Sequence, residues 1–461
     1  MQNLSARKQT RQTTTKEGYM ACAGWSSIDS TPPLGLPMGG RGPRFYPGGE
    51  VLDPLAAQVV VLEDAKGART IWMSIDMIGM SWAETSGFRH ELSAMTGVPF
   101  ESILVNFSHT HSGPMSGYEG YATLKPKPKA LADYELNLMT RCVRMTLDAV
   151  ENMRDVTVIA HRGQSDIGIN RRLREPDGTM VMGPNPAGHY NSDLWVLDLQ
   201  AKTDRCILFS YGCHPVMVYG YAWDGISADW PGKCRDRMSE TLGCHAQFIQ
   251  GFAGNVRPRR LADLESHAFR KATPEDVVAT GHEIADDVAR AIESGGEEIA
   301  LDLANVSGFA MTPRDHTNIA DLGHWEVLAN SDEEINQNLG EYWYERLKAG
   351  IPPVKYLPWS VGLIRLAPGH QIAWMANEVL GEWLHLLREW LSDPNLIGWG
   401  YCQDGRNYMP TDELIHEGGY EVDRANTFSR NGPGPVAQGI NEAVKQTFLE
   451  MKDRLTGNEQ A

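Results

Sequence analysis

The chain has 461 residues, of which 42% are hydrophobic and 22% are charged, and these proportions are ordinary for a soluble globular protein with a sizeable core. This length suits either two or three ordinary domains or one large catalytic domain. The formal net charge of −17 disfavours nucleic acid as a partner, and it also disfavours attachment to anionic lipid by charge attraction.

The start of the chain, its cysteines and its apolar runs predict where in the cell the protein is found. Residues 1–22 are expected to be a disordered leader, because this polar stretch lacks the apolar segment of a signal peptide. The remaining residues, 23–461, are expected to form one domain because no clear linker interrupts them. The seven cysteines show no Cys-x-x-Cys spacing, which favours buried thiols in a reducing, cytoplasmic compartment. No apolar run approaches the 18 residues of a membrane span, so stable membrane anchoring is not expected.

Strand-like and helix-like segments alternate along the chain, and this alternation predicts an α/β arrangement of mixed α+β type. Apolar runs with strand character are 56–62, 70–75, 103–107, 156–160, 195–199, 206–212, 247–250, 361–366 and 371–375. Helical patterns cover 82–95, closed by Gly97, and also 130–153, 273–293, 331–350, 383–390 and 436–455. The helix over 331–350 is expected to be exposed.

Two histidines follow the apolar run from Ile103 to Phe107. Because side chains alternate along an extended chain, His109 and His111 are predicted to face the same small volume. Neutral imidazoles at a strand end suit a metal such as zinc. The alternative is a pair of loop histidines that bond to backbone carbonyls, and this stretch alone does not decide between the two.

Two further apolar strands lead to candidate ligands, His214 after 206–212 and Glu378 after 371–375. Sites often lie at the carboxyl ends of strands, and histidines with a carboxylate match a catalytic zinc site. Alternatively, His214 is a turn residue before Pro215, and Glu378 is the first-turn acid of the following helix. The absence of a Gly-x-Ser-x-Gly elbow and of a Walker loop disfavours serine hydrolases and nucleotide enzymes, so metal-dependent hydrolysis is the remaining prediction.

Short motifs in order over residues 26–425 resemble those of the neutral (non-lysosomal) ceramidase family and its bacterial relatives. The motifs are Thr31-Pro-Pro-Leu-Gly35, Asp53-Pro-Leu55, Ser108-His-Thr-His-Ser-Gly-Pro114, Asn170-Arg171, Cys213-His-Pro215, Ser227-Ala-Asp229, Gly251-Phe-Ala-Gly-Asn-Val-Arg-Pro258, Asn377-Glu378, and Tyr408 with Tyr420-Glu421. The Thr-His-Ser-Gly-Pro element is quite specific, and the ordered set is stronger than any one piece.

The resemblance implies one large catalytic domain with two mixed β-sheets flanked by many helices. It also implies a zinc-dependent hydrolase that cleaves an amide bond of a small-molecule substrate. His111 is expected beside the metal as a proton donor or acceptor. Tyr401 and Tyr420 remain alternatives to one implied ligand, Tyr408. The full set of implied zinc ligands is His109, His214, Glu378 and Tyr408.

Three more residues are predicted to act in catalysis. Arg171 matches the family's Asn-Arg element, and it either holds a substrate oxygen or pairs with a buried acid. In ceramidases the Gly-rich loop reads Gly-Asp-x-Ser-Pro and its serine acts in the active site, whereas Asn255 and Arg257 occupy the corresponding positions here. A guanidinium suits a carboxylate or phosphate. The chain also ends soon after these motifs, and we therefore expect a smaller soluble substrate, with an anionic group near Arg257.

Three other functions compete with an amidase. The same metal site would serve an ester or lactone hydrolase, because water attacks all three carbonyls. An amidohydrolase barrel also uses a His-x-His pair, but normally on its first strand. The third alternative is a protein that keeps this scaffold and binds a metal but catalyses no reaction. The sequence does not predict an oligomeric state.

Overall fold

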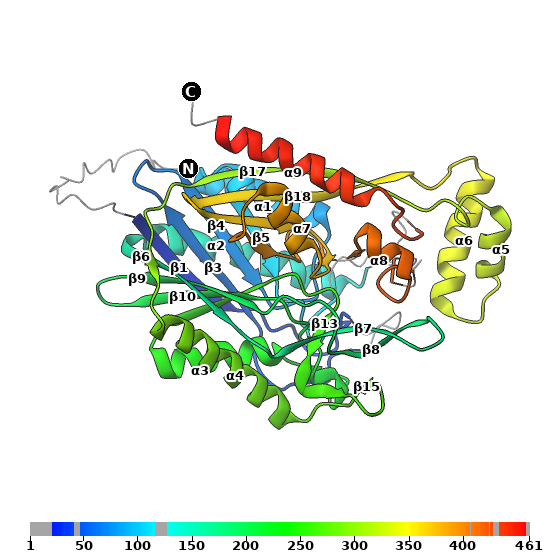
Figure 1. Cartoon of the computed structure of the whole chain (residues 1–461), viewed down its shortest axis with the longest axis horizontal. Coiled ribbons are helices and arrows are strands. Elements are labelled where there is room, and N and C mark those ends of the chain that lie inside the picture. Colours follow the sequence, from blue (N-terminus) through cyan, green and yellow to red (C-terminus); the bar gives the residue numbers. More distant parts are fainter. Residues whose placement is uncertain are drawn as a thin grey trace.

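The computed structural model describes residues 21–40, 47–115, 127–405, 407–423, 425–426 and 433–457. Within these ranges, a nine-stranded mixed sheet has the order β12-β10-β9-β6-β1-β3-β4-β5, and β16 pairs with β6 (Figure 1). Its strands are β1 (Ala21–Asp29), β3 (Ala56–Glu63), β4 (Arg69–Ile75), β5 (Ile103–Phe107), β6 (Arg154–Gln164), β9 (Asp193–Gln200), β10 (Arg205–Tyr211), β12 (His245–Gln250) and β16 (Glu297–Glu298).

A second, four-stranded sheet has the order β17-β18-β19-β21. Its strands are β17 (Ala304–Pro313), β18 (Tyr356–Ala367), β19 (His370–Met375) and β21 (Ile397–Trp399). Short ladders complete the described strands: β13 (Val256–Pro258) with β7 (Gly168–Arg174) and β8 (Met180–Asn185), β20 (Glu378–Val379) with β22 (Tyr408–Met409), β2 (Glu50–Val51) with β11 (Gly225–Ile226), and β14 (Ala262–Asp263) with β15 (Ala268–Phe269).

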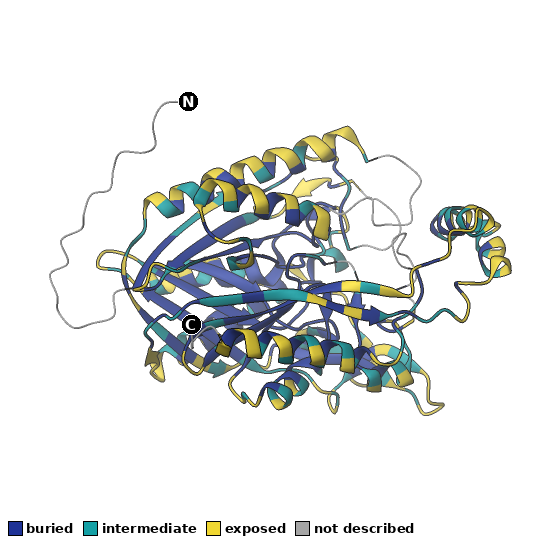
Figure 2. Ribbon diagram, turned by 90° about the horizontal axis from the view of Figure 1, so that it is seen from above, coloured by how far each residue is buried: buried dark blue, intermediate teal, exposed yellow. Residues whose placement is uncertain are grey.

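The helices lie outside the two sheets, which face each other across a core rich in tryptophan. Trp72 of β4 and Trp195 of β9 contact Trp399 of β21, with ring centroids 5.0 and 5.8 Å apart. Figure 2 shows buried strands between helices whose outer faces are exposed. The helices are α1 (Trp82–Thr96), α2 (Lys129–Glu151), α3 (Asp229–Leu242), α4 (Pro274–Glu293), α5 (Leu322–Ala329), α6 (Glu334–Lys348), α7 (Trp383–Leu391), α8 (Asp412–Glu417) and α9 (Ile440–Gly457).

Each sheet has its own helical cover, which gives a layered arrangement. Helices α1 and α2 pack on β3, β4 and β5, and helices α3 and α4 pack on β9, β10 and β12. Helices α7 and α9 pack on the four-stranded sheet. The prediction of an α/β fold with two mixed sheets flanked by helices is therefore confirmed.

Several predicted boundaries are confirmed by local chemistry. Helix α1 starts at Ser81, whose side chain forms a capping box with Glu84, and it ends at Gly97 with a left-handed φ of 74°. Strand β1 starts at Ala21, two residues before the expected start of the domain at 23. The rest of the predicted leader lies outside the described residues.

The helix predicted to be exposed over 331–350 is partly buried, so this expectation is wrong. It corresponds to α6, which packs against α5 at one end of the molecule (Figure 1). Trp343 of α6 and Trp325 of α5 are 3% and 1% exposed, with ring centroids 6.1 Å apart. The two amphipathic helices bury their apolar faces against each other.

The structure shows the state of the cysteines and the character of the helices. All seven cysteines are buried and free, as the absence of paired spacings predicts. Among the helices of the described ranges, none combines the length and the apolar character that a bilayer crossing demands.

Candidate metal centre

Three histidines from two strand ends converge in the interior. One nitrogen each of His109, His111 and His214 lies within 4.8 Å of the other two. His109 and His111 follow β5, and His214 follows β10. His109 and His214 are 1% and 0% exposed. The predicted convergence of these side chains is therefore present, and this buried group could hold a metal ion.

The route by which His109 and His111 converge differs from the predicted one. Strand β5 ends at Phe107, and His109 has a left-handed φ of 64°. Strand alternation therefore no longer applies at these positions. The two rings face the same volume because the chain turns at His109, and their planes lie at 79° to each other.

Backbone carbonyls orient all three rings. A ring Nδ1 that lies against a carbonyl oxygen carries the proton, so the Nε2 lone pair of the same ring is left to face the centre. Ligand histidines in metal sites are oriented in this way. The Nδ1 contacts are His109 with Ile78 O at 2.6 Å, His111 with Gly40 O at 2.6 Å, and His214 with Ala253 O at 2.7 Å.

The Glu378 carboxylate faces two of these lone pairs. Its Oε2 lies 3.0 Å from His214 Nε2 and 3.2 Å from His109 Nε2. Because both rings already use Nδ1–H on a carbonyl, these are contacts between acceptors that call for a cation between them. Burial and Arg171 lower the pKa of His214 to about 4, so a proton on that ring is disfavoured.

The spacing of these donors fits a metal ion. Donor atoms at about 2.0–2.2 Å from zinc, placed at the corners of a tetrahedron, lie about 3.3 Å apart. The two separations from Glu378, at 3.0 and 3.2 Å, are close to that value.

Tyr408 is placed next to Glu378 by backbone pairing. The two residues are direct partners in the short parallel ladder of β20 and β22. Tyr408 is 5% exposed, and its hydroxyl accepts a hydrogen bond from Arg171 Nη2 at 2.9 Å. A tyrosine and a glutamate thirty residues apart in the sequence are thus neighbours in this ladder.

The two alternative tyrosines lie in different environments. Tyr401 is fully buried, its ring centroid is 4.4 Å from that of His109, and its hydroxyl has no hydrogen-bond partner among the described residues. Tyr420 is 40% exposed, and its ring contacts that of Tyr408 at 5.7 Å. Burial alone therefore favours Tyr408 and Tyr401 over Tyr420 as neighbours of a metal.

Arg171, on β7, pairs with a buried acid, which is one of the two roles that the sequence left open. Its Nε donates to Glu421 Oε1 at 2.8 Å, which is a buried ion pair. Its Nη2 donates to the hydroxyl of Tyr408, which places positive charge at the candidate centre. Arg172 Nη1 contacts the second oxygen of Glu421 at 2.9 Å. One carboxylate therefore fixes two adjacent arginines.

Asn255 connects the Gly-rich loop to the start of α7. Its Nδ2 donates to both carboxylate oxygens of Glu382, at 2.9 and 2.8 Å. Its Oδ1 accepts from the backbone N–H of Gly381 at 2.9 Å. These bonds occupy both ends of the amide, so the described contacts of Asn255 are those of a residue that positions the loop.

Arg257 lies in a different environment, near His111. Its Nη2 donates to the hydroxyl of Tyr219 at 3.2 Å, and the ring of Tyr219 stacks on that of His111 with centroids 5.8 Å apart. No sequence pattern singles out Tyr219, because it follows the His214 turn in an irregular segment. Glu421 belongs to one of the motifs that resemble the ceramidase family, but that motif does not predict its ion pairs with Arg171 and Arg172.

Two buried amides brace the loops that carry the histidines. Gln250 Nε2 donates to the carbonyls of Ser108 and Cys213, at 3.0 and 2.9 Å, and these residues precede His109 and His214. Asn106 Nδ2 donates to Gly400 O at 2.8 Å. The buried side chain of Gln250 thus links both histidine turns.

Replacing Gln250 with Leu should weaken both stability and metal binding. Two buried carbonyls would lose their donor, and the expected loss in the free energy of unfolding is about 2–4 kcal/mol. Metal affinity should fall about 10- to 100-fold, because the ligand turns lose their brace. Gln247→Leu is the matched control, since Gln247 on the same strand donates to Trp72 O and has no side-chain bond to a histidine turn among the described residues. Urea unfolding and metal titration would show a loss of stability in both variants but a loss of affinity in Gln250→Leu alone.

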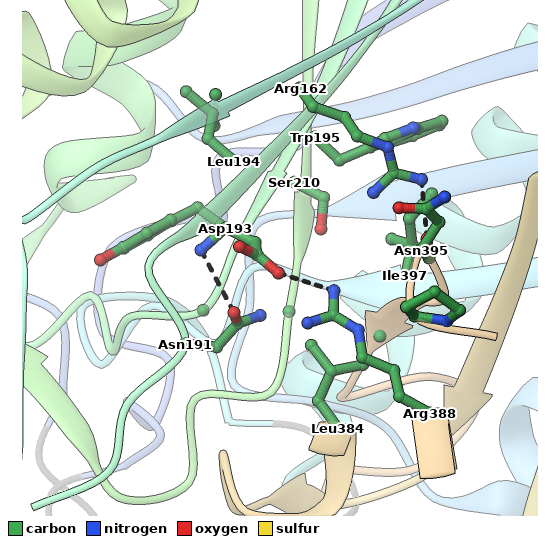
Figure 3. A pocket seen from close by; sticks show the side chains of 16 residues that line it. Arg162, Asn191, Asp193, Leu194, Trp195, Ser210, Leu384, Arg388, Asn395 and Ile397 are labelled. Carbon is green, nitrogen blue, oxygen red and sulfur yellow. Dashed lines mark hydrogen bonds and ion pairs between the residues drawn. The ribbon is translucent and has the colours of Figure 1, made fainter. Parts of the chain in front are cut away.

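A separate cavity of about 220 Å³ lies between the nine-stranded sheet and α7 (Figure 3). Two arginines border it: Arg388 Nη2 pairs with Asp193 at 2.6 Å, and Arg162 Nη2 donates to Asn395 O at 2.7 Å. None of the residues that line this cavity is one of the predicted site residues. The cavity is therefore distinct from the histidine cluster.

Comparison with known proteins shows what the fold is like. No protein-family model matches the sequence, and no curated protein matches it. The neutral ceramidase from Pseudomonas aeruginosa aligns with a TM-score of 0.71 and 17% identity, over 96% of this chain and 75% of that one. A ceramidase complexed with C2 aligns with a TM-score of 0.70 and 16% identity, over 96% of this chain and 76% of that one. The chain therefore has a ceramidase-like fold, as its motifs imply, with a buried histidine group that could hold a metal ion.

Proposed function

We propose that this protein is a zinc-dependent hydrolase that cleaves an amide bond in a small soluble substrate. The observation that carries the proposal is the Glu378 carboxylate, which contacts the Nε2 atoms of His109 and His214 while both rings use Nδ1 on backbone carbonyls. The ceramidase-like fold supports the same function. The seven buried thiols fit a reducing, cytoplasmic compartment.

The side chains of this chain have distinct roles in the proposal. The ion would be held by His109, His214, Glu378 and Tyr408. When bound, zinc lowers the pKa of a water ligand toward neutrality and polarises a carbonyl. Tyr408 is fixed for this position by its hydrogen bond from Arg171.

His111 is the proposed proton acceptor and donor. Burial and the two neighbouring histidines hold its pKa well below the usual range, so the ring is neutral. Its Nδ1 is held on Gly40 O, and its Nε2 can therefore take a proton from the attacking water and pass it to the leaving amine. Arg171 can donate to the oxygen of the scissile carbonyl as negative charge develops there.

Metal removal tests the proposal. The purified protein should contain about one zinc per chain and hydrolyse members of a panel of simple amides. Dialysis against a chelator should abolish turnover, and added zinc should restore it. Mass spectrometry of the metal and detection of released amine are the measurements.

Three results would contradict the proposal. A protein that binds zinc but turns over neither amides nor esters would be a metal-binding relative without catalysis. A protein that cleaves only esters or lactones would share the site but not the proposed bond. Full activity in the metal-free protein would exclude the metal from the reaction.

A further inference from the structure

A guanidinium without an acidic partner lies beside the candidate metal centre. Arg257 is half-buried, and among the described residues its side chain makes no ion pair with a carboxylate. Its contacts are the hydroxyl of Tyr219 at 3.2 Å, the sulfur of Met182 at 3.7 Å, and the ring of Phe269, 4.7 Å from its Cζ. These groups surround the cation but do not neutralise it.

The contrast with the neighbouring arginines is direct. Arg171 and Arg172 both pair with Glu421, and the three side chains are almost fully buried. Arg257 lies on β13 and pairs with Ile169 of β7. Ile169 precedes Arg171 by two residues on the same strand. Burial and the charge of Arg171 both lower the pKa of Arg257. Arg171 and Arg172 thus have carboxylate partners, whereas Arg257 has none within ion-pair distance among the described residues.

Tyr219 connects Arg257 to the chemistry. The phenol accepts from the guanidinium, and its ring is nearly parallel to that of His111, with an interplanar angle of 28°. A ring contact and a hydrogen bond through Tyr219 thus link Arg257 to His111. Withdrawing a cation from water costs free energy unless an anion or strong acceptors compensate it.

We propose that the substrate carries an anionic group beside its amide and that Arg257 binds this group. A carboxylate is the class that the planar fork of a guanidinium favours, because it can accept two parallel hydrogen bonds. The inference rests on the proposed function. Hydrolysis consumes one water, breaks the C–N bond and releases a carboxylic acid and an amine, so the anionic group passes unchanged into one product.

A series of amides with one acyl group and three amine parts tests the proposal. The amine part ends in a carboxylate, in the isosteric carboxamide, or in an ammonium group. The wild-type protein should prefer the carboxylate in kcat/KM by about tenfold to a hundredfold, mainly through KM. In Arg257→Gln this preference should fall to near unity, and in Arg257→Glu it should shift toward the ammonium substrate.

Arg260→Gln is the matched control for charge, because Arg260 is three residues away and pairs with the exposed Glu283. It should keep the wild-type preference. Calorimetric titration of each metal-free protein with N-acetylglycine and with its amide gives a readout that does not depend on turnover. Only the acid should bind, and only when Arg257 is present.

The outcomes separate this inference from the proposed function. Equal kcat/KM for the charged and neutral amides would overturn the role of Arg257 and leave the amidase standing. A preference that survives in Arg257→Gln would also overturn it. If no amide is cleaved, the proposed function fails, and the calorimetric comparison alone decides whether Arg257 binds the carboxylate. If inorganic phosphate binds more tightly than N-acetylglycine, the anionic group is not a carboxylate and that part of the proposal is overturned.

Discussion

His109→Ala is expected to remove bound metal and activity together, whereas His111→Ala should keep most of the metal and lose rate. His109 Nε2 is buried and faces Glu378, so its removal takes away one of the histidine contacts of the carboxylate. His111 is the proposed acid–base group, and such a group contributes about 10²- to 10⁴-fold. Metal content by mass spectrometry and kcat on the best amide are the measurements.

A histidine outside the group of three controls for the substitution itself. His282 is a half-buried residue of α4, and His282→Ala should keep both metal and rate. If His111→Ala loses as much metal as His109→Ala, His111 is a metal ligand, and all three histidines of the group coordinate the ion. If His109→Ala keeps its metal, the assignment of the centre is wrong.

The strand ends could be predicted because burial leaves a clear pattern in the sequence. β5, β10 and β19 are short runs with almost no exposed residue, and each is followed within a few positions by His109, His214 or Glu378. A chain that buries such strands delivers its next polar residues to one edge of the core. The conformation of the turns is not encoded in that pattern, as the left-handed φ of His109 shows.

Tyr408 could not be predicted from local sequence. Strand β22 has two residues, and its pairing with β20 places Tyr408 opposite Glu378. A pairing between two such short segments depends on the surrounding structure and has no periodicity of its own. Only the motif resemblance pointed to this residue.

Helices α3 and α5 were not predicted, and the exposure of α6 was misjudged, for physical reasons. Helix α3 contains Pro231 and Gly232 in its first turn, and both residues lower helix propensity. The proline is tolerated because the first turn has no intrahelical partner for its N–H. Helix α6 was expected to be exposed because its partner α5 was not recognised, and a buried tryptophan pair is a tertiary contact that a single helix cannot reveal.

Arg171→Ala should reduce the rate more than Glu421→Gln does, whereas Glu421→Gln should reduce the stability more. Arg171→Ala removes the donor at Tyr408 and at the substrate oxygen, and loss of one such donor typically costs about 10²- to 10³-fold in kcat. Its effect on stability should be the smaller of the two, because Glu421 keeps its contact with Arg172 at 2.9 Å.

Glu421→Gln should be the more destabilising change, by about 3–5 kcal/mol in the free energy of unfolding, because it leaves the buried Arg171 without a carboxylate. Arg172 keeps only Glu417, at 3.1 Å. Denaturant unfolding and kcat of the folded fraction measure the two effects independently. If Arg171→Ala loses stability but retains wild-type kcat, Arg171 acts only through its buried ion pair. A lost rate that Arg171→Lys partly restores would assign the guanidinium charge to the transition state, because lysine restores the charge but not the two-pronged contact to Glu421 and Tyr408.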